Sequence, residues 1–330
     1  MSGAPRVLVT GGNGTLGRQV VVALAGLAPS IEAVVSLDVK PADRRTPGVV
    51  EATADIRDPL LAALMREHRI DTVVHLAAIV TPGRRPDRAL EYQVDVEGTR
   101  NVLGACEAAG VTRLVVSSSG AAYGYHPDNP RWLTEDDPLR GNEAFAYSWH
   151  KRLVEEMLAE HRRRRPRLQQ VVLRIGTILG ASVANQITAL FDQPRPLAVA
   201  GSDSPFVFAW DQDVVGAIVH AVRGGPAGIY NVAGDGALTI HEIAARMGKR
   251  CRVLPPWLLL AGLWIGRRLG LTPYGPEQLR FLRYRLVLDN RKLKEVFGYT
   301  PRKTSAEAFD VWWAARHQRA QRDPAPRSRA

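Results

Sequence analysis

Cysteine is scarce in this sequence: Cys106 and Cys251 are the only two in 330 residues. They lie far apart, and neither stands in a spacing typical of zinc ligands, so we predict no disulfide framework and no metal site. Long hydrophobic runs are also absent, since the longest one near the C-terminus, Trp257 to Ile265, is far below the ~20 residues that a membrane span needs. The first apolar strand begins almost at Met1, which leaves no room for a signal peptide. These absences predict a cytoplasmic protein.

Acidic residues are outnumbered by basic ones, with 33 Asp and Glu against 44 Lys and Arg, a formal net charge of +11 and a pI near 10.1. Such a charge raises the question of a nucleic-acid or membrane partner. The densest basic run, from His161 to Arg167, closes a predicted helix, where positive charge is favourable. No nucleic-acid recognition motif accompanies the charge, so we predict no nucleic-acid partner. The composition, 45% hydrophobic and 23% charged, is typical of a globular protein.

From Val7 on, the sequence contains an apolar strand followed by a glycine-rich turn, VLVTGGNGTLG. A helix is predicted over 18–25, directly after the turn. Glycine lets the backbone turn tightly and approach a ligand, and a helix N-terminus presents free N–H groups to phosphate. The strand, turn and helix therefore predict a site for the pyrophosphate of a dinucleotide. Its predicted cofactor-binding residues are Gly11, Gly14, Thr15, Leu16 and Gly17.

A second predicted strand ends in Asp38, at the spacing from Gly17 that a ribose-binding acid has. A carboxylate about 20 residues after such a turn holds the ribose hydroxyls of NAD and repels the 2′-phosphate of NADP. Lys40, Arg44 and Arg45 follow and offer positive charge for that phosphate. We predict NAD as the cofactor and leave NADP open. A helix-capping or loop role is the structural alternative for Asp38.

Predicted strands and helices alternate along the first half of the chain. The strands are expected at 33–38, 49–54, 72–76 and 114–117, and the helices at 60–66, 89–109 and 144–161. This order is typical of an α/β fold, a Rossmann-type doubly wound parallel sheet. His75 ends one buried strand with no second ligand-type side chain nearby, so we interpret it as a hydrogen-bonded structural residue.

The second half has shorter and less regular elements, which we interpret as a smaller C-terminal substrate-binding lid. The predicted NAD-binding domain covers 1–180 and includes 211–235; the lid covers 181–210 and 236–317, and a disordered tail covers 318–330. Within the lid, 255–268 begins with two prolines, is apolar on nearly every face and ends in two arginines. We interpret it as a buried lid helix, with a weak membrane-surface contact or an apolar substrate entrance as alternatives.

Three side chains suited to hydride-transfer chemistry occur near the middle of the chain. Tyr147 and Lys151 are four positions apart on a predicted helix, hence on one face, and Ser119 ends a predicted strand, at the edge where open α/β sheets bind ligands. A phenol has a pKa of about 10. The Lys151 ammonium and the positive charge of oxidised nicotinamide would lower it, which makes Tyr147 a candidate base. Ser119, followed by Gly120, would bind the substrate oxygen. The alternative is a surface Tyr/Lys pair.

Together these motifs resemble those of the extended short-chain dehydrogenase/reductases, the NAD-dependent epimerase/dehydratase family, from about residue 5 to residue 315. The resemblance rests on Thr10–Gly17, Asp38, Asp55–Ile56, His75–Ala78, Gly98–Val102, Ser117–Ser119, Tyr123–Gly124, Tyr147 with Lys151, Leu173–Arg174, Asp211–Val215 and Gly228–Gly234. It implies that Tyr147 is the general acid/base, that Lys151 holds the nicotinamide ribose and that Ser119 orients the substrate. The other implied cofactor contacts are Asp55 and Ile56, on the adenine, and Leu76, Ala77 and Ala78, at a strand end. The resemblance also implies a homodimer through two long helices.

The chain departs from that family at three places. Asp95 stands where the family has an asparagine that supports the cofactor region. Nucleotide-sugar members carry an arginine-containing run where this chain has Ser204 to Trp210, SPFVFAW, and often an asparagine where it has Ile175-Gly176-Thr177. Both of the latter departures weigh against a UDP-sugar, because a diphosphate favours arginine.

The overall pattern still resembles the UDP-glucose 4-epimerase-like subgroup. We therefore predict reversible hydride transfer at a secondary alcohol or ketone of a sugar or nucleotide sugar. A 3β-hydroxysteroid-dehydrogenase-like enzyme acting on an apolar ketone or alcohol is the first alternative, and a non-catalytic dinucleotide-sensing regulator is the second. Arg280, Arg283 and Arg285 either hold a phosphate or face water.

Overall fold

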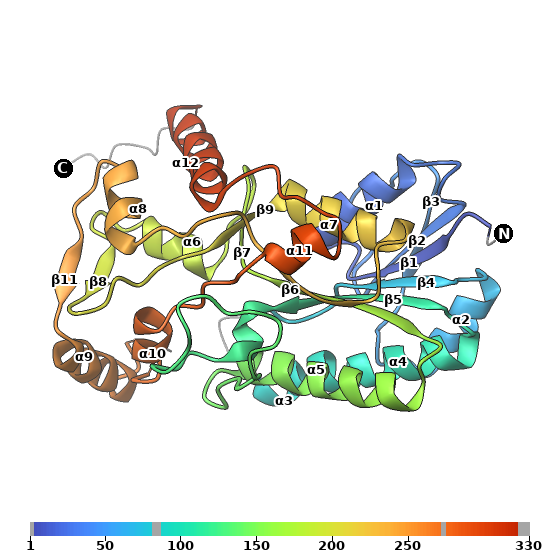
Figure 1. Cartoon of the computed structure of the whole chain (residues 1–330), viewed down its shortest axis with the longest axis horizontal. Helices are drawn as coiled ribbons and strands as arrows, with labels where there is room; N and C mark the ends of the chain where they lie inside the picture. Colours follow the sequence, from blue (N-terminus) through green and yellow to red (C-terminus); the bar gives the residue numbers. More distant parts are fainter. Residues whose placement is uncertain (1–2, 81–86, 272–274, 323–330) are drawn as a thin grey trace.

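The computed structural model describes residues 3–80, 87–271 and 275–322. Within them, the larger part of the molecule is built on one sheet of seven parallel strands, in the order β10-β6-β5-β4-β1-β2-β3 (Figure 1). The strands are β1 (Arg6–Thr10), β2 (Ala33–Asp38), β3 (Val49–Thr53), β4 (Thr72–His75), β5 (Arg113–Ser119), β6 (Gln169–Ile175) and β10 (Gly228–Val232). The chain starts at β1 and winds outward in both directions, so the predicted Rossmann-type doubly wound sheet is confirmed.

Helices cover both faces of the sheet, as a parallel sheet requires because both of its faces are apolar. One face carries α1 (Thr15–Ala25), α7 (Asp211–Arg223) and α11 (Arg291–Glu295) (Figure 1). The other carries α2 (Leu61–Glu67), α4 (Gly98–Ala109) and α5 (Ala146–Arg164). The apolar run Val7, Leu8 and Val9 lies fully buried between them. α1 begins at Thr15, three residues before the predicted start. The glycine turn is therefore shorter than the sequence pattern suggests.

The helix predicted over 89–109 is interrupted once. α3 (Arg88–Tyr92) passes through a π-helical turn, η1 (Gln93–Glu97), into α4. Such turns occur frequently at functional sites. Here the turn contains the buried Asp95, whose carboxylate accepts a hydrogen bond from Ile79 N at 2.8 Å, in the loop after β4.

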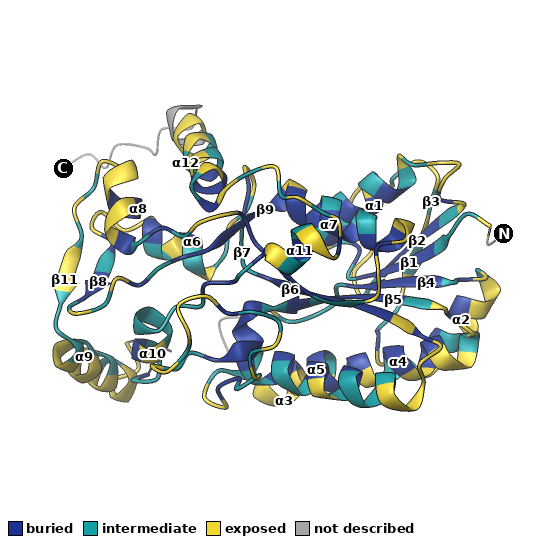
Figure 2. Ribbon diagram, in the orientation of Figure 1, coloured by how far each residue is buried: buried dark blue, intermediate teal, exposed yellow. Residues whose placement is uncertain are grey.

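The smaller part of the molecule is built from short strand pairs and helices. β7 (Thr177–Leu179) pairs with β9 (Phe208–Trp210), and β8 (Leu197–Val199) pairs with β11 (Arg252–Leu254). Its helices are α6 (Gln186–Phe191), α8 (Ile240–Arg246), α9 (Pro256–Arg268), α10 (Gln278–Arg283) and α12 (Ser305–Arg322). Its aromatic core contains Phe191, Phe206, Phe208, Phe309 and Trp312. α8 and α12 are buried where they meet this core and exposed on the outside (Figure 2).

The observed elements differ from the predicted division at two places. Leu293 and Phe297 are buried in the core of the larger part, beside α7 and β10, although the sequence predicts a lid over 236–317. α12 continues to Arg322, so 318–322 are helical where the sequence predicts a disordered tail. Residues 323–330 lie outside the described residues. The predicted return of 211–235 agrees with the sheet, since α7 covers it and β10 is its edge strand.

The predicted burial of 255–268 is wrong. α9 forms at this place, but none of its 13 residues is buried. Trp257 is 68% exposed and Trp264 is 57% exposed. Figure 2 shows α9 at the far end of the smaller part, exposed along most of its length. α9 is therefore an apolar helix presented at the surface of the molecule. No helix in the described ranges is both long and apolar enough to cross a bilayer.

Candidate active site

A cavity of about 480 Å³ lies along the carboxyl edge of the sheet, where open α/β folds bind ligands. It is bounded by the β1–α1 turn, by the ends of β4, β5 and β6, by the start of α5 and by segments of the smaller part. Most of the predicted site residues line it: Gly11, Gly14, Thr15, Leu16, Gly17, Leu76, Ala78, Ser119, Gly120, Tyr147 and Lys151. The parallel register brings these residues together because the strands all end at the same edge.

The shape of the glycine turn depends on contacts that a side chain would break. Gly11 has a φ of +71°, and a Cβ on it would stand 2.8 Å from Ala77 N. A Cβ on Gly17 would overlap the Gly11 carbonyl oxygen, so α1 packs directly on the turn. α1 begins after Gly14 with no side-chain cap and no acid in its first turn. Its first N–H groups therefore offer the cavity an anion site that fits the pyrophosphate of a dinucleotide.

Asp38, at the end of the neighbouring strand β2, stabilises this turn through hydrogen bonds. Its carboxylate accepts hydrogen bonds from Asn13 N at 3.0 Å and from Lys40 N at 3.1 Å. Asp38 and Ala77 do not line the cavity themselves, but they hold the turn that does. The basic residues at 44 and 45 are exposed. The charged group beside the turn is therefore a carboxylate, which fits the ribose hydroxyls of NAD better than a 2′-phosphate.

The structure does not bring Asp55 and Ile56 to this cavity. The Asp55 carboxylate pairs with the Arg57 guanidinium at 2.7 Å, and that hydrogen-bonded partner lowers the pKa of Asp55. Ile56 is 4% exposed and packs against Gly98, where a Cβ would clash with its side chain. Its carbonyl accepts a hydrogen bond from Asn101 Nδ2 at 2.7 Å. The contacts of both residues are thus structural. The Asp55 pair stabilises the loop after β3, and the Ile56 contacts attach that loop to α4.

Tyr147, Lys151 and Ser119 meet inside the cavity as predicted. Lys151 Nζ donates to the Ser117 carbonyl at 2.8 Å and lies 5.7 Å from the centroid of the Tyr147 ring. The Ser119 hydroxyl interacts with the Tyr147 phenol in a way that favours the deprotonated phenol. Ser148 Oγ donates to the Ala121 carbonyl at 2.6 Å and thereby ties the first turn of α5 to the end of β5. This anchor sets the rotation of α5 that directs its neighbour Tyr147 into the cavity.

In the chain without a cofactor, the pKa of the Tyr147 phenol is raised. Burial raises the pKa of Tyr147 to about 12; the hydrogen bond from Ser119 opposes this rise, and the charge of Asp95 adds to it. Lys151 is not among the groups that shift this pKa. Burial also lowers the pKa of Lys151, while Asp95 and Glu155 act in the opposite direction. The chain by itself therefore keeps the phenol protonated, and lowering its pKa requires positive charge from a bound ligand.

The departure at Asp95 has a structural explanation. Its two carboxylate oxygens have separate partners, since Oδ1 accepts from Ile79 N at 2.8 Å and Oδ2 lies 2.9 Å from His150 Nδ1. The His150 ring also meets Tyr92 edge-on at 5.7 Å. Asp95 thus ties the loop after β4 to α5 next to Lys151, and an acid at this position supports the site as an asparagine would.

His75 is confirmed as a hydrogen-bonded structural residue. Its Nδ1 lies 2.8 Å from Thr10 Oγ1, and its Nε2 lies 3.0 Å from Thr99 Oγ1. The Thr99 hydroxyl donates its proton to the Asp95 carbonyl at 2.6 Å, so it accepts from His75 Nε2, and Nδ1 accepts from Thr10. Burial lowers the pKa of His75 to about 3, so the ring is neutral. It connects β1, β4 and α4 behind the site.

The wall of the cavity opposite the glycine turn is aromatic and contains an arginine. The Arg285 guanidinium lies between two rings, 4.2 Å from the centroid of Phe206 and 4.0 Å from that of Phe281. Its Nε and Nη2 are buried and have no hydrogen-bond partner within the described part of the chain. Burial lowers the pKa of Arg285 to about 10, against the nearby phenol of Tyr125, which favours the charged form. The cavity wall therefore holds a guanidinium with two nitrogens that no described residue binds.

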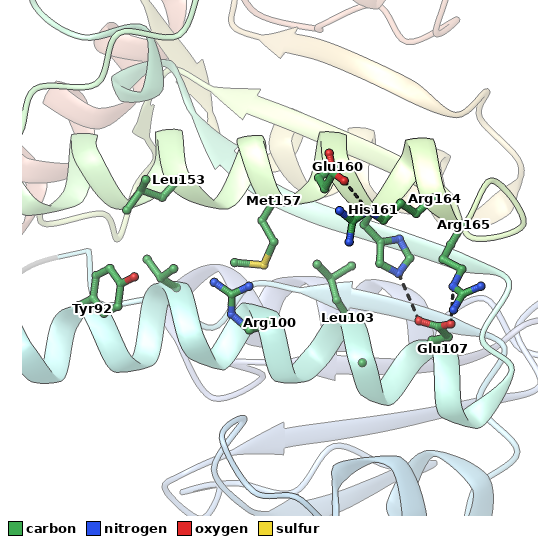
Figure 3. Close-up of a pocket in the computed structure, with 12 residues that line it drawn as sticks. Tyr92, Arg100, Leu103, Glu107, Leu153, Met157, Glu160, His161, Arg164 and Arg165 are labelled. Atoms are coloured by element: carbon green, nitrogen blue, oxygen red, sulfur yellow. Dashed lines mark ion pairs between the residues drawn. The ribbon is translucent and has the colours of Figure 1, made fainter.

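A second cavity, of about 710 Å³, lies between α4 and α5 (Figure 3). Leu103, Leu153 and Met157 give it an apolar lining. At one end Glu107 pairs with Arg165 at 2.6 Å and approaches His161 at 3.9 Å. None of the predicted catalytic or cofactor residues lines it. It is therefore separate from the candidate active site and presents the sides of two long helices.

The NAD dependent epimerase/dehydratase family matches residues 7–233, which contain the glycine turn and the three side chains at the centre of the cavity. The chain belongs to this family. As a member it is an NAD-dependent enzyme, and the uncapped N-terminus of α1 and the carboxylate of Asp38 are the features of this chain that fit NAD.

Relatives with curated sequences support the same family. An uncharacterised protein of Mycobacterium tuberculosis H37Rv is 30% identical over 319 residues, which cover 94% of this chain and 84% of the relative. A UDP-glucose 4-epimerase of Azospirillum brasilense is 32% identical over 222 residues, which cover 61% of each protein. The alignment with the epimerase thus spans less than two thirds of its length.

Solved structures share the fold across almost the whole chain. The UDP-glucose 4-epimerase of Thermotoga maritima, solved with UDP-glucose, superposes with a TM-score of 0.74 at 19% identity, over 95% of this chain and 99% of the other. DesIV of Streptomyces venezuelae, a dTDP-glucose 4,6-dehydratase, superposes with a TM-score of 0.73 at 24% identity, over 96% and 98%. At these identities the likeness shows the fold, and the substrate has to be argued from the cavity itself.

Most of the residues that form the cavity wall facing the cofactor site were not predicted from the sequence. Tyr125, Phe281 and Leu288 line the cavity although no motif marks them. Asn185 also lines it, but its side chain is engaged as the cap of α6, accepting from Ile187 N at 2.9 Å. The only signal for this wall was the arginine-rich stretch 280–285, and the sequence left open which arginine, if any, met a ligand.

Proposed function

We propose that this enzyme oxidises and re-reduces one secondary hydroxyl of a nucleotide sugar, as a 4-epimerase does. The observation that carries the proposal is the guanidinium of Arg285, which lines the same cavity as Tyr147 and Ser119 and has two buried nitrogens without a partner among the described residues. An unpaired cation inside a protein costs free energy, and an anionic ligand offsets this cost through charge-assisted hydrogen bonds. A nucleoside diphosphate supplies that anion, and its sugar supplies the secondary hydroxyl. An apolar ketone supplies no partner for the arginine.

The position of Arg285 also compensates for the arginine that is missing from residues 204–210, which weighed against a nucleotide sugar. The segment from Ser204 to Trp210 lacks the arginine that nucleotide-sugar members carry there. In the structure the Arg285 guanidinium lies 4.2 Å from the Phe206 ring, so an arginine from a distant segment stands at this place. Arg280 is exposed and Arg283 lies over the Tyr284 ring, which leaves Arg285 as the one of the three that meets the cavity.

The residues around the reacting carbon have separate roles in this proposal. NAD, when bound, accepts a hydride and returns it. Tyr147 Oη takes the proton from the substrate hydroxyl during oxidation and gives it back during reduction. Ser119, which lines the same cavity and interacts with that phenol, holds the substrate oxygen beside it. Lys151 is held by the Ser117 carbonyl at the base of the cavity, where it can meet the nicotinamide ribose.

A substrate comparison tests the proposal. The purified chain is incubated with UDP-glucose or UDP-galactose, and separately with a steroid secondary alcohol and NAD. We expect interconversion of the two nucleotide sugars without lasting accumulation of reduced nicotinamide, because an epimerase returns the hydride. Steady formation of reduced nicotinamide with the steroid alone would instead establish the apolar-substrate alternative. Tight NAD binding without turnover of a wide panel of nucleotide sugars or ketones would favour a dinucleotide-sensing regulator.

Replacing Asp95 is expected to change the pH dependence of this reaction. The charge of Asp95 raises the pKa of Tyr147, and the neutral amide in Asp95→Asn removes that charge. Oxidation needs the deprotonated phenol and is therefore favoured above the pKa of Tyr147, so lowering this pKa moves the rise in kcat/KM to lower pH. His150 keeps a partner, since Nδ1 can accept from the amide.

The measurement for Asp95→Asn is a pH profile of kcat/KM in the oxidation direction. Asp136→Asn is the matched control, because Asp136 is exposed and is not among the groups that shift the pKa of Tyr147. We expect the control profile to coincide with that of the parent enzyme. A displacement of the Asp95→Asn profile to higher pH would show that the carboxylate acts on the phenol in another way.

We also propose that the enzyme is a homodimer formed through α4 and α5. The groove between these helices is lined by the buried Leu103 and the half-buried Leu153 and Met157, and charged side chains gather at one end of it (Figure 3). Met157→Glu places a charge in the middle of the groove and is expected to shift the protein from dimer to monomer in analytical ultracentrifugation. Val22→Glu, at an exposed valine of α1, is the control and should leave the mass unchanged. An unchanged dimer in Met157→Glu would locate the interface elsewhere.

A further inference from the structure

α9 is the least explained element of the molecule. It contains the sequence PWLLLAGLWIGRR, and none of its residues is buried. Leu259 and Leu263 lie half-buried along one side, while Trp257, Leu258, Leu260, Trp264 and Ile265 are between 39% and 68% exposed. Scattered exposed apolar side chains are ordinary, but a contiguous apolar surface of this kind marks an interaction site. Water is therefore a poor environment for the outward side of this helix.

The helix is held in place from its C-terminal end. Arg267 Nη1 pairs with Glu277 at 3.0 Å, just before α10, and α9 packs beside that helix. α10 in turn contributes Phe281 to the wall of the active-site cavity. In Figure 1, α9 lies at the end of the smaller part that is farthest from the sheet strand β3. The apolar surface is thus on the substrate side of the molecule and away from the proposed dimer groove.

The charge of the residues near α9 in the sequence indicates which kind of surface covers the helix: a second copy of this chain or an anionic surface. Between residues 249 and 285 the chain has eight basic residues and a single acid, Glu277, which already pairs with Arg267. Five of the basic residues are exposed: Arg250, Arg252, Arg267, Arg268 and Arg280. A second copy of the same surface would bring these cations together, which disfavours self-association. An anionic surface complements them.

We propose that α9 docks this enzyme on a membrane surface that contains anionic lipids. A short helix with tryptophans on its outer side and arginines at its end lies in the plane of the interface, with the aromatic rings at the level of the headgroups. At 13 residues α9 is too short to span, so the attachment is peripheral. The Arg268 guanidinium lies over the Trp264 ring at 5.6 Å, so a positive charge stands directly beside an aromatic ring of the apolar side, as it does at the level of lipid headgroups. This inference does not depend on which substrate the cavity takes.

The test is sedimentation of the full-length protein with vesicles of phosphatidylcholine alone or mixed with phosphatidylglycerol. We expect the protein to sediment with the anionic vesicles at low salt, to bind the neutral vesicles much less, and to be partly released by high salt. Failure to bind the anionic vesicles at low salt would overturn the proposal. Equal binding to both kinds of vesicle at every salt concentration would overturn the role of the arginines.

Variants of the outer side locate the binding surface. Trp257→Ser with Trp264→Ser is expected to weaken binding to anionic vesicles more than tenfold, since each ring contributes apolar area to the interface. Trp132→Ser, at a tryptophan that is 39% exposed in another loop, is the matched control and should bind like the parent protein. If the control loses as much binding as the double variant, or if the double variant binds normally, α9 is not the docking element.

A charge series separates lipid binding from self-association. Each exposed arginine next to an anionic membrane contributes about fivefold to the partition coefficient, so Arg268→Gln with Arg280→Gln is expected to lower it about 25-fold. Arg163→Gln with Arg223→Gln removes two exposed charges at the ends of α5 and α7 and should have little effect. An oligomer that the tryptophan variant dissociates, in a protein that binds no vesicles, would identify a second copy as the occupant and overturn the proposal. Melting temperatures equal to that of the parent protein confirm that each variant is folded.

Discussion

Tyr147→Phe is expected to lower kcat by about three orders of magnitude while NAD affinity changes little, because general acid/base catalysis contributes roughly 10²- to 10⁴-fold. The substitution removes one oxygen atom and leaves the ring, the helix and the contact with Lys151 in place. The lost oxygen is the group that takes and returns the proton in the proposed reaction, inside the cavity that Ser119 also lines. The rate of nucleotide-sugar interconversion and the dissociation constant of NAD, measured on the same preparation, check the two halves of this expectation.

Tyr125→Phe is the matched control for this experiment. Tyr125 lines the same cavity, and burial raises its pKa to about 12, as it does for Tyr147. Its phenol is not paired with Ser119, so we expect kcat within about tenfold of the parent enzyme, well inside the range of a proton-transfer group. If both phenylalanine variants lost activity equally, the loss would reflect the polarity of the cavity. If Tyr147→Phe kept its activity, another group would have to move the proton.

Arg285→Met is expected to raise the KM for a nucleotide sugar about 10- to 100-fold, since hydrogen bonds to charged groups contribute roughly 1.5–3 kcal/mol. kcat should change much less, because the arginine faces the distant part of the substrate and Tyr147 is untouched. The stability of the chain should change little. The guanidinium loses its contacts with Phe206 and Phe281, but two unpaired buried nitrogens disappear with it.

Steady-state kinetics with the nucleotide sugar and a thermal melt of the ligand-free protein measure these effects separately. Arg280→Met is the control, because Arg280 is exposed on α10, a few residues from Arg285 in sequence, and does not line the cavity. A large fall in melting temperature for Arg285→Met would mean that the arginine mainly supports the aromatic wall. Unchanged KM in a folded variant would remove the main argument for an anionic substrate.

The glycine turn and the pair on α5 could be predicted because their geometry is local. A strand, a glycine-rich turn and a helix follow one another within Val7–Ala25, and a spacing of four places Tyr147 and Lys151 on one helical face wherever that helix lies. The convergence of these parts was also predictable, because consecutive parallel strands end at one edge of the sheet. The raised pKa of Tyr147 in the ligand-free chain could not be predicted, since it depends on burial, and no local pattern measures burial.

The contacts of Asp95 and Arg285 could not be read from the sequence. Asp95 meets His150 across 55 residues, and an acid in place of an amide carries no information about the donor that faces it. Arg285 meets Phe206 and Phe281 only after the smaller part has folded over the sheet edge. Three arginines within six residues were equivalent in the sequence, and the path of the chain after α10 directed one of them into the cavity.

For α9 the sequence predicted a buried helix, and the structure has an exposed one. Its apolar sequence predicted burial because hydropathy measures the free energy of transferring a side chain out of water. Hydropathy does not distinguish a side chain covered by its own chain from one covered by another surface. Within the described residues, Trp257 and Trp264 stay 68% and 57% exposed. Whether an apolar helix is covered by the same chain or by another surface is a property of the packed molecule.

The sequence by itself determined the doubly wound sheet, the dinucleotide turn and the spacing of the reacting phenol and ammonium, because each follows from periodicities and turn chemistry within a few residues. The tertiary structure alone decided which arginine meets the cavity, what Asp95 binds and that α9 stays uncovered. Those properties arise from contacts between segments far apart in the chain, and such contacts exist only once the strands and the smaller part have packed together.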